Sequence, residues 1–348
     1  MGGSATFSTP AEPSVGPGKP RRTIKQVPGP TDKRRKTFQR AAPALAADER
    51  IGDVVTTEHE RAARMELHEG AVWDQCAAAA SALPGNPLGV EIDRSGPVPL
   101  VALRAVDRPD LNRVVALGVR VPARVDDVDA ICAFYAAHEQ RCFRIEVTPA
   151  ARPSALDEWV AAKGLVRDGP ATYKLWRAMT PPLVVPQGVD VRRLDACDAD
   201  AIASLNILAW GAWGTPLLRA WFGATVGLAG VQHYGVFDRD RLVATGALFV
   251  QDRLGWFGFD ATHPRHQGAQ LRQAISALRL EDAAAHGCDI VHAESAIPLS
   301  ARAARDGWQL LYEKQNYSSV RAENAFFPEN DPECARTRSR IERTSSRT

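Results

Sequence analysis

The chain has 348 residues, 45% hydrophobic and 24% charged, with a formal net charge of +2. This length allows two domains, and the near-neutral charge excludes a protein that binds its partner through a strong overall charge of either sign. Six widely spaced cysteines without a C-x-x-C pair argue against a zinc site and a disulfide framework, and favour a reducing, cytoplasmic location.

The first segment in chain order, residues 1–50, is basic and rich in proline. It carries ten Lys or Arg against four acids and too few large apolar residues to offset its ordering entropy. We predict a disordered tail here and a second one at 330–348, each either a solvated segment or a basic arm for nucleic acid. No apolar run approaches the roughly 18 residues that span a bilayer, so we expect no membrane segment.

Residues 52–180 are predicted to form a first α+β unit. Apolar residues recur at helical spacing after His59, and Pro84-Gly85 ends that pattern. The expected elements are one or two helices at 59–83, strands at 88–93, 98–105 and 112–120, a helix at 125–138, a strand at 143–147, a helix at 154–163 and a strand at 171–177.

Residues 186–325 repeat this order. The expected elements are a strand at 189–194, helices at 198–209 and 215–227, strands at 232–237, 241–250 and 255–262, a helix at 268–286 stopped by Gly287, a strand at 289–293, a helix at 300–305, and strands at 308–312 and 317–321. The repeated order favours two α+β units, each with its own mixed, mostly antiparallel sheet and flanking helices, over one continuous sheet.

The segment from Asp260 to Leu271 joins a strand to the longest helix of the second half. Gly268 lets the backbone approach a ligand closely, and the first N–H groups of the helix have no partners within it. Together with the positive end of the helix dipole and the cation of Arg265, they form a site suited to a pyrophosphate.

This turn, Arg265-His266-Gln267-Gly268-Ala269-Gln270, resembles the R/Q-x-x-G-x-G/A turn of GNAT N-acetyltransferases. That family holds the coenzyme A pyrophosphate there through backbone amides. Similar pieces are Ala285-His286-Gly287-Cys288-Asp289 and Asp306-Gly307-Trp308, and, in the first half, Leu111 to Gly118 and Glu158 to Leu165. The resemblance covers about 55–325 and implies two GNAT-like domains in tandem.

The sequence departs from the family pattern in two places. Gln270 stands where Gly or Ala is usual, and the junction 121–127 of the first half has no glycine and carries acids at its helix start. Because carboxylates there would repel a phosphate, we expect the domain at 52–180 to be degenerate and only the domain at 186–325 to bind cofactor.

The resemblance also implies which residues act. Two carboxylates at strand ends, Asp260 and Glu294, are the candidate catalytic residues, and apolar neighbours favour a raised pKa for Asp260. His263 and His266 flank the turn as alternative bases, and Trp210 and Trp213 are candidates for the acceptor wall. The expected cofactor-binding residues are Ala261, Thr262, Arg265, His266, Gln267, Gly268, Ala269 and Gln270, with no metal.

The implied function is an acetyl-CoA-dependent N-acetyltransferase that transfers an acyl group directly to a primary amine of a small molecule. The alternatives are a catalytically silent acyl-CoA-binding or scaffold protein of the same fold, and a nucleic-acid-associated protein that acts through its basic tails. We expect a small-molecule amine as partner, neither membrane nor nucleic acid, and a monomer or homodimer.

Overall fold

The computed structural model describes residues 57–167, 172–209, 217–266 and 268–319, and the backbone of two short strands, Arg50–Ile51 (β1) and Val54–Val55 (β2). Residues 47–348 form one compact unit. The tails predicted at 1–50 and 330–348 fall, except for Arg50, outside the described residues. Within the described part of the chain, no helix is long and apolar enough to cross a membrane.

The N-terminal half opens with a helix, α1 (Glu58–Ser81), whose first turn is fixed by the local sequence. The hydroxyl of Thr57 accepts a hydrogen bond from the backbone N of Glu60 at 3.2 Å, and the Glu60 carboxylate accepts one from the backbone N of Thr57 at 2.9 Å. This reciprocal cap satisfies two donors that the helix itself leaves without partners. The other elements of this half are β3 (Val90–Asp93), β4 (Leu100–Leu103), β5 (Arg113–Val114), α2 (Val125–Ala137), β6 (Arg144–Val147), α3 (Leu156–Ala162), β7 (Val166–Arg167) and β8 (Thr172–Ala178).

The C-terminal half follows the predicted order closely. Its elements are β9 (Asp190–Leu194), the 3-10 helix η1 (Ala196–Asp198), α4 (Ala199–Ala209), α5 (Leu218–Ala224), β10 (Val231–Asp238), β11 (Arg241–Gln251), β12 (Leu254–Thr262), α6 (Ala269–Ala285), β13 (Ile290–Ser295), α7 (Ala301–Arg305) and β14 (Gln309–Ser318). Two predictions need correction: β5 is much shorter than the expected strand at 112–120, and the two strands expected at 308–312 and 317–321 are one strand, β14.

Among the described residues, one sheet of ten strands runs through both halves in the order β5-β6-β14-β8-β13-β12-β11-β10-β9, with β7 also paired to β14. The pairs β5–β6 and β12–β13 are parallel, and the other pairs are antiparallel. The fold is therefore α+β with a mixed sheet, as predicted. The expectation of a separate sheet in each half is wrong, because the two halves share strands.

The halves are joined by a reciprocal exchange of their last strands. β8, which ends the first half, lies between β13 and β14 of the second half. The final residues of β14, 315–318, lie in turn beside β6 and β7 of the first half. Each half thus completes the sheet of the other, which the order of elements along the chain could not reveal.

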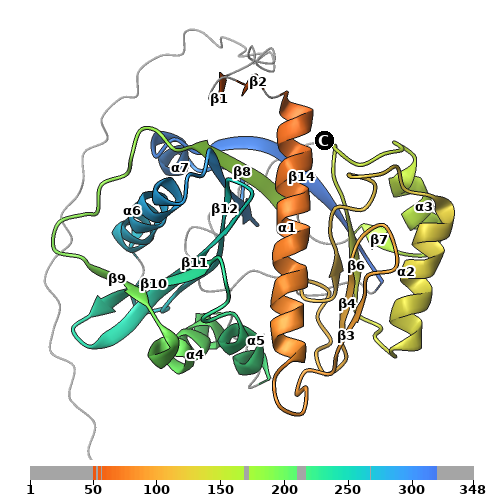
Figure 1. Cartoon of the computed structure of the whole chain (residues 1–348), viewed down its shortest axis with the longest axis horizontal. Coiled ribbons are helices and arrows are strands. Elements are labelled where there is room, and N and C mark those ends of the chain that lie inside the picture. The colour runs from red at the N-terminus through yellow and green to blue at the C-terminus, as the bar shows by residue number, and fades with distance from the viewer. Residues whose placement is uncertain are drawn as a thin grey trace, which may run out of the picture. The chain divides into compact units, whose positions relative to one another are not determined.

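Helices cover both faces of the sheet in the C-terminal half (Figure 1). Because side chains alternate along a strand, Phe257 packs with Ile275 of α6 on one face, while Trp256 packs with Trp221 of α5 on the other. α1 belongs to this second face, where Val72 joins the same apolar cluster. We call the two sides the α6 face and the α1 face.

Candidate functional site

The parallel strands β12 and β13 lose contact with each other partway along their length. They pair from Leu254, opposite Ile290, to Phe257, opposite Ala293. Beyond that pair, β12 continues along β11 to Thr262, and β13 continues along β8 to Ser295. An opening between two strands at the middle of a sheet leaves backbone groups on its edges without a neighbouring strand, and such groups can bind an extended ligand.

A β-bulge lies on β12 at this opening. Between the pairs Ala247–Gly258 and Thr245–Ala261, β11 has one residue, Gly246, and β12 has two, Phe259 and Asp260. Phe259 has a φ of 53°, which is rare for a residue with a large side chain.

The bulge reverses the side-chain alternation of β12 and thereby places Asp260. Without it, Asp260 would face α1; instead both of its oxygens bind Arg279 of α6, at 2.7 and 3.2 Å. Phe259 turns to the α1 face, where its ring lies 5.8 Å from that of Phe222. The two predicted catalytic carboxylates therefore lie on opposite faces of the sheet, because Glu294 faces α1.

Beyond β12, the backbone enters α6 as the sequence predicts. Gly268 is the N-cap of α6, and being a glycine it has no side chain that could cap the first N–H groups. A Cβ added at Gly268 would meet nothing closer than 3.8 Å. Ala269 and Gln270 form the start of the helix, whereas Gln267 lies outside the described residues.

The N–H of Thr262 points into the opening. Backbone N–H groups alternate in direction along a strand, and that of His263 donates to the Val243 oxygen of β11 at 2.8 Å. The N–H of Thr262 therefore points away from β11, on the side where β13 is no longer paired. Of the predicted cofactor-binding residues, those described lie on one stretch from the end of β12 to the first turn of α6.

Cationic and imidazole groups flank this stretch. Arg265 is exposed, and Nε2 of His266 lies 3.1 Å from the Asp238 carboxylate. His263 is 6% exposed, and Arg241 lies 2.8 Å from its Nε2. Burial first, and then the charge of Arg241, lowers the pKa of His263, which keeps this imidazole neutral beside an anion site.

The corresponding place in the N-terminal half is filled by the chain itself. The Asp127 carboxylate accepts a hydrogen bond from the backbone N of Arg124 at the start of α2, at 2.7 Å. The backbone of Arg152 accepts from Ala123 at 2.7 Å and donates to Gly118 at 2.9 Å, so it bridges the turn between β5 and α2. A carboxylate and a peptide thus bind the N–H groups of Arg124 and Ala123, the two residues just before α2.

No family model matches the sequence, and no curated protein matches it. Solved structures do match. A GCN5-related N-acetyltransferase from Kribbella flavida is similar over 72% of this chain and 97% of its own, with 17% identity and a TM-score of 0.52. A tandem GNAT protein from the clavulanic acid biosynthesis pathway is similar over 75% of this chain and 98% of its own, with 18% identity and a TM-score of 0.47.

The chain has the GNAT fold. In this chain, the sequence motif that begins at Arg265 lies where it was expected in the GNAT fold, between a strand, β12, and a helix, α6. At 17% identity this structural similarity establishes the fold alone, and the activity has to be argued from the site itself.

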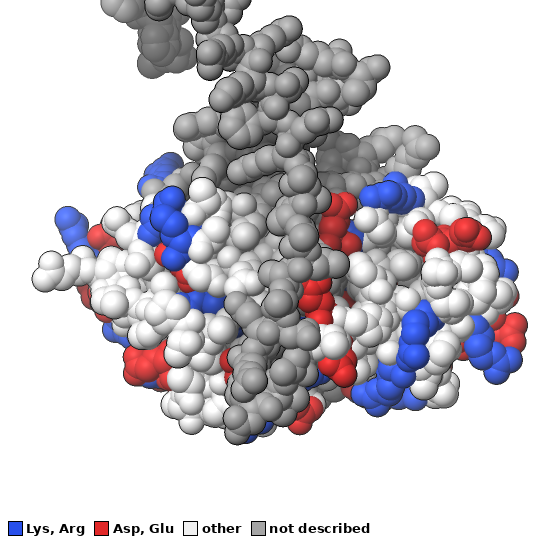
Figure 2. Space-filling view, turned by 90° about the horizontal axis from the view of Figure 1, so that it is seen from above, with Lys and Arg blue, Asp and Glu red and all other residues white. Residues whose placement is uncertain are grey.

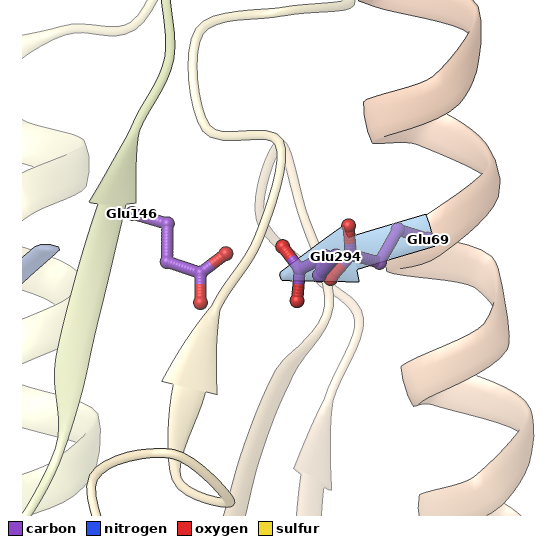
Figure 3. A group of neighbouring side chains, drawn as sticks. All are labelled: Glu69, Glu146 and Glu294. Carbon is purple, nitrogen blue, oxygen red and sulfur yellow. The ribbon is translucent and has the colours of Figure 1, made fainter. Parts of the chain in front are cut away.

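Glu294 belongs to a cluster of eight charged residues between the two halves, which we call the central ion cluster. Four are acids and four are bases, and they come from α1, β5, β6, β8, β13 and β14. Figure 3 shows the three carboxylates at its centre, with Glu146 and Glu69 approaching Glu294 from different elements. The members are Glu66, Glu69, Arg113, Arg144, Glu146, Lys174, Glu294 and Lys314.

Lys314 fills the centre of this cluster. Its Nζ lies 3.0 Å from Glu69, 2.8 Å from Glu146 and 2.5 Å from Glu294. Three carboxylates so close together could hold a metal ion, but here the Lys314 ammonium lies among them, and Arg113 and Lys174 supply further positive charge. Burial alone would lower the pKa of Lys314, but the carboxylates, that of Glu146 first among them, outweigh it and raise the pKa.

Glu294 is the member of the carboxylate trio with the most exposed side chain, at 15% against 0% for the other two. Burial alone would raise its pKa, but Arg113 and Lys314 outweigh that effect and hold the pKa well below its usual value. At neutral pH this group is therefore a carboxylate at the edge of a buried network, suited to contact a cation.

Sequence reasoning missed Arg279 and Lys314. A signal existed for Arg279, which lies four residues after Ile275 and eight after Leu271 and so falls within the apolar stripe of its helix. For Lys314 the sequence offers no periodic signal, because this residue lies between the two strands expected at 308–312 and 317–321. Trp210 and Trp213, the expected acceptor wall, lie outside the described residues.

The anion site at α6 predicts the effect of Gly268→Glu. The new carboxylate should occupy the phosphate position and weaken acetyl-CoA binding at least about a hundredfold, since a like-charge contact costs several kcal/mol. The melting temperature should not change, because the position has room for a side chain. Titration calorimetry measures the affinity, and the wild type should bind one acetyl-CoA per chain.

Gly223→Glu on α5 is the matched control, since a Cβ at Gly223 meets nothing within 4 Å and this position too has room for a side chain. It adds the same charge away from the turn and should bind acetyl-CoA like the wild type. Equal binding by the Gly268 variant would refute the site.

The central ion cluster predicts that Lys314→Met is strongly destabilising. The variant leaves three carboxylates without their shared cation, and an unpaired buried charge of this kind costs about 3–5 kcal/mol. Urea unfolding measures the free energy. The control is Arg94→Met, which removes an exposed 2.7 Å ion pair with Asp74 and should cost under about 1 kcal/mol. Similar costs for both variants would contradict the prediction.

Proposed function

We propose that this protein is an acetyl-CoA-dependent N-acetyltransferase that acylates a primary amine of a small molecule by direct transfer. The observation that carries this proposal is the opening between β12 and β13 beside the uncapped start of α6. It combines strand-edge N–H groups with a cluster of free helical N–H groups, which suits an extended ligand that ends in a pyrophosphate.

The residues of β12 and α6 have distinct parts in this proposal. The N–H groups of α6 at Ala269 and Gln270, with the cation of Arg265, would hold the pyrophosphate of acetyl-CoA. The backbone at Ala261 and Thr262 would bind the pantetheine arm and stabilise the carbonyl oxygen during transfer. Acetyl-CoA supplies the activated acyl group.

The amine would approach on the α1 face, opposite α6. Glu294 lies there at the end of β13, and its charge would attract an ammonium group and orient it toward the opening. Because the carboxylate is held in its charged form, it is better suited to bind the ammonium than to accept a proton from it. The amine would pass its proton to this group or to solvent. Asp260, on the other face, remains the second candidate for the base.

The N-terminal half would then be a platform rather than a second catalytic domain, with 52–180 and 186–325 as the two GNAT-like parts. The capped start of α2 and the backbone bridge at Arg152 support this role. The central ion cluster ties the platform to β13.

A role in nucleic-acid binding has less support in the described residues. Figure 2 shows Lys and Arg interspersed with Asp and Glu on the face in view, apart from the grey atoms. A basic groove for a nucleic-acid backbone would instead gather Lys and Arg side chains without acids among them.

None of the five cysteines within the described residues is in a disulfide, which supports the proposed cytoplasmic location.

The direct test is a panel of small primary amines with acetyl-CoA and a thiol-sensitive dye. An N-acetyltransferase should release free thiol in step with an acetylated amine detected by mass spectrometry, and the Gly268→Glu variant should release none. Measurable acetyl-CoA binding without thiol release for any amine would favour a silent acyl-CoA-binding protein. Absence of acetyl-CoA binding by the wild type would refute the proposal.

The proposed contact between Glu294 and the amine predicts the behaviour of Glu294→Gln. Loss of the charge should lower kcat/KM for the amine about 10–100-fold, the range expected when a hydrogen-bonded contact to a charged group is lost. Affinity for acetyl-CoA should be unchanged, because the cofactor would bind from the α6 face.

The matched control is Glu146→Gln in the same cluster. Glu146 also contacts Lys314 and Arg113, but it lies on β6 of the N-terminal half and has no exposed side-chain surface. Both variants should lose stability, and only Glu294→Gln should lose kcat/KM. An equal loss of activity in both would show that Glu294 acts through the fold alone.

A further inference from the structure

We infer that Arg279 is a positioning residue for the donor site: from α6 it fixes the bulge of β12 and so aims the N–H group of Thr262 into the opening. This inference rests on the proposed use of acetyl-CoA. It assigns a role to an arginine that does not belong to the sequence motif.

Arg279 joins three parts of the site. One Nη donates to the Ala247 oxygen of β11 at 3.1 Å, and both Nη atoms contact the Asp260 carboxylate of β12, at 2.7 and 3.2 Å. Its guanidinium carbon lies 4.2 Å from the centre of the Phe257 ring. The same side chain thus contacts the last residue of β12 that pairs with β13, the bulge that follows it, and the neighbouring strand.

The bulge needs such support. Phe259 adopts a φ of 53°, a conformation that a bulky residue holds only where its surroundings enforce it. The next residue, Asp260, is held from the α6 side by Arg279, and Ala261 and Thr262 come directly after. A change in the bulge therefore changes the direction of the Thr262 N–H group at the opening.

The missing side chain of Gly246 leaves the room that Arg279 occupies. A Cβ at Gly246, the residue opposite the bulge, would lie 2.9 Å from an Nη of Arg279 and 2.9 Å from the Asp260 carboxylate. Only glycine lets the guanidinium pass beneath β11 to reach Asp260.

The arginine is a costly choice if stability were its only purpose. Its side chain is 3% exposed, and its buried Nε has no hydrogen-bond partner among the described residues. An unsatisfied buried donor costs free energy, and an apolar side chain of similar volume would avoid that cost. The contacts with the bulge give a reason for retaining the charge.

The test is Arg279→Met, which keeps the volume and removes the contacts with Ala247 and Asp260. Calorimetry on the full chain should show a Kd for acetyl-CoA raised about tenfold, the effect of weakening one or two hydrogen bonds. Without ligand, amide hydrogen exchange at 259–262 should be faster than in the wild type, a change that loss of activity alone would not produce.

Arg177→Met is the matched control. Arg177 is equally buried and donates to the Asp306 oxygen at 2.6 Å, but it holds the linker after β8 and not the bulge. Its removal should cost stability and leave both the Kd and the exchange at 259–262 unchanged. An effect on Kd as large as that of Arg279→Met would overturn the inference.

A second variant keeps the inference testable if Arg279→Met does not fold. Gly246→Ala displaces the Arg279–Asp260 pair by a single methyl group and should raise the Kd in the same direction, whereas Gly223→Ala should not. Wild-type affinity in Gly246→Ala or in a folded Arg279→Met overturns the inference alone. A wild type that does not bind acetyl-CoA overturns it together with the proposed function.

Asp260→Asn separates positioning from base catalysis. The new amide keeps one acceptor for Arg279. If Asp260 only positions the bulge, the amide should partly replace the carboxylate, and the Kd for acetyl-CoA should lie between those of the wild type and Arg279→Met. The pH profile of kcat should then be unchanged. If Asp260 is instead the base, kcat should fall, and the pH profile of kcat should lose its acidic limb, while the Kd stays at the wild-type value. That result would overturn the inference.

Discussion

The structure depends on the pairing of eight charges that are buried between the two halves. An unpaired ion in such a place costs several kcal/mol, so every member of the central ion cluster must be brought to its partner. The exchanged strands do this. β8 brings Lys174 opposite Glu294, and β14 brings Lys314 between the carboxylates of both halves, at the residue where it passes from β8 to β6. Several of these ion pairs cross between the halves, Lys314 with Glu69 and Glu146 and Glu294 with Arg113, so the halves depend on each other for folding.

Two similar units thus differ in what their openings hold. In the C-terminal half, the edges of β12 and the start of α6 keep their N–H groups directed toward space that a ligand can enter. In the N-terminal half, the Asp127 carboxylate and the backbone of Arg152 bind the N–H groups of Arg124 and Ala123, just before α2. A carboxylate at a helix start repels a phosphate, whereas an uncapped start has N–H groups that can bind one. The proposed donor site is therefore placed in the C-terminal half alone.

Much of the fold could be predicted because its signals are local. Helices such as α1 and α6 carry apolar residues at helical spacing and clear stops, and the meander of β10, β11 and β12 has short turns, so their bounds agree with expectation within a few residues. The strand exchange could not be predicted, since pairing between distant strands leaves no periodicity in either. The turn at Gly268 was located for the same local reason, whereas the partners of Asp260 and Glu294 depend on contacts from other elements.

The bulge shows how one inserted residue decides the chemistry of this site. In a regular strand, Phe257 and Asp260 would face opposite sides, and Asp260 would join Glu294 on the α1 face, which would give two carboxylates around one amine. The extra residue turns Asp260 toward α6, where Arg279 binds it, and places Phe259 on the α1 face. The α1 face therefore keeps the partly exposed carboxylate of Glu294 and gains the Phe259 ring. The α6 face gains a stretch of backbone that Arg279 holds, so the same irregularity shapes both sides of the opening.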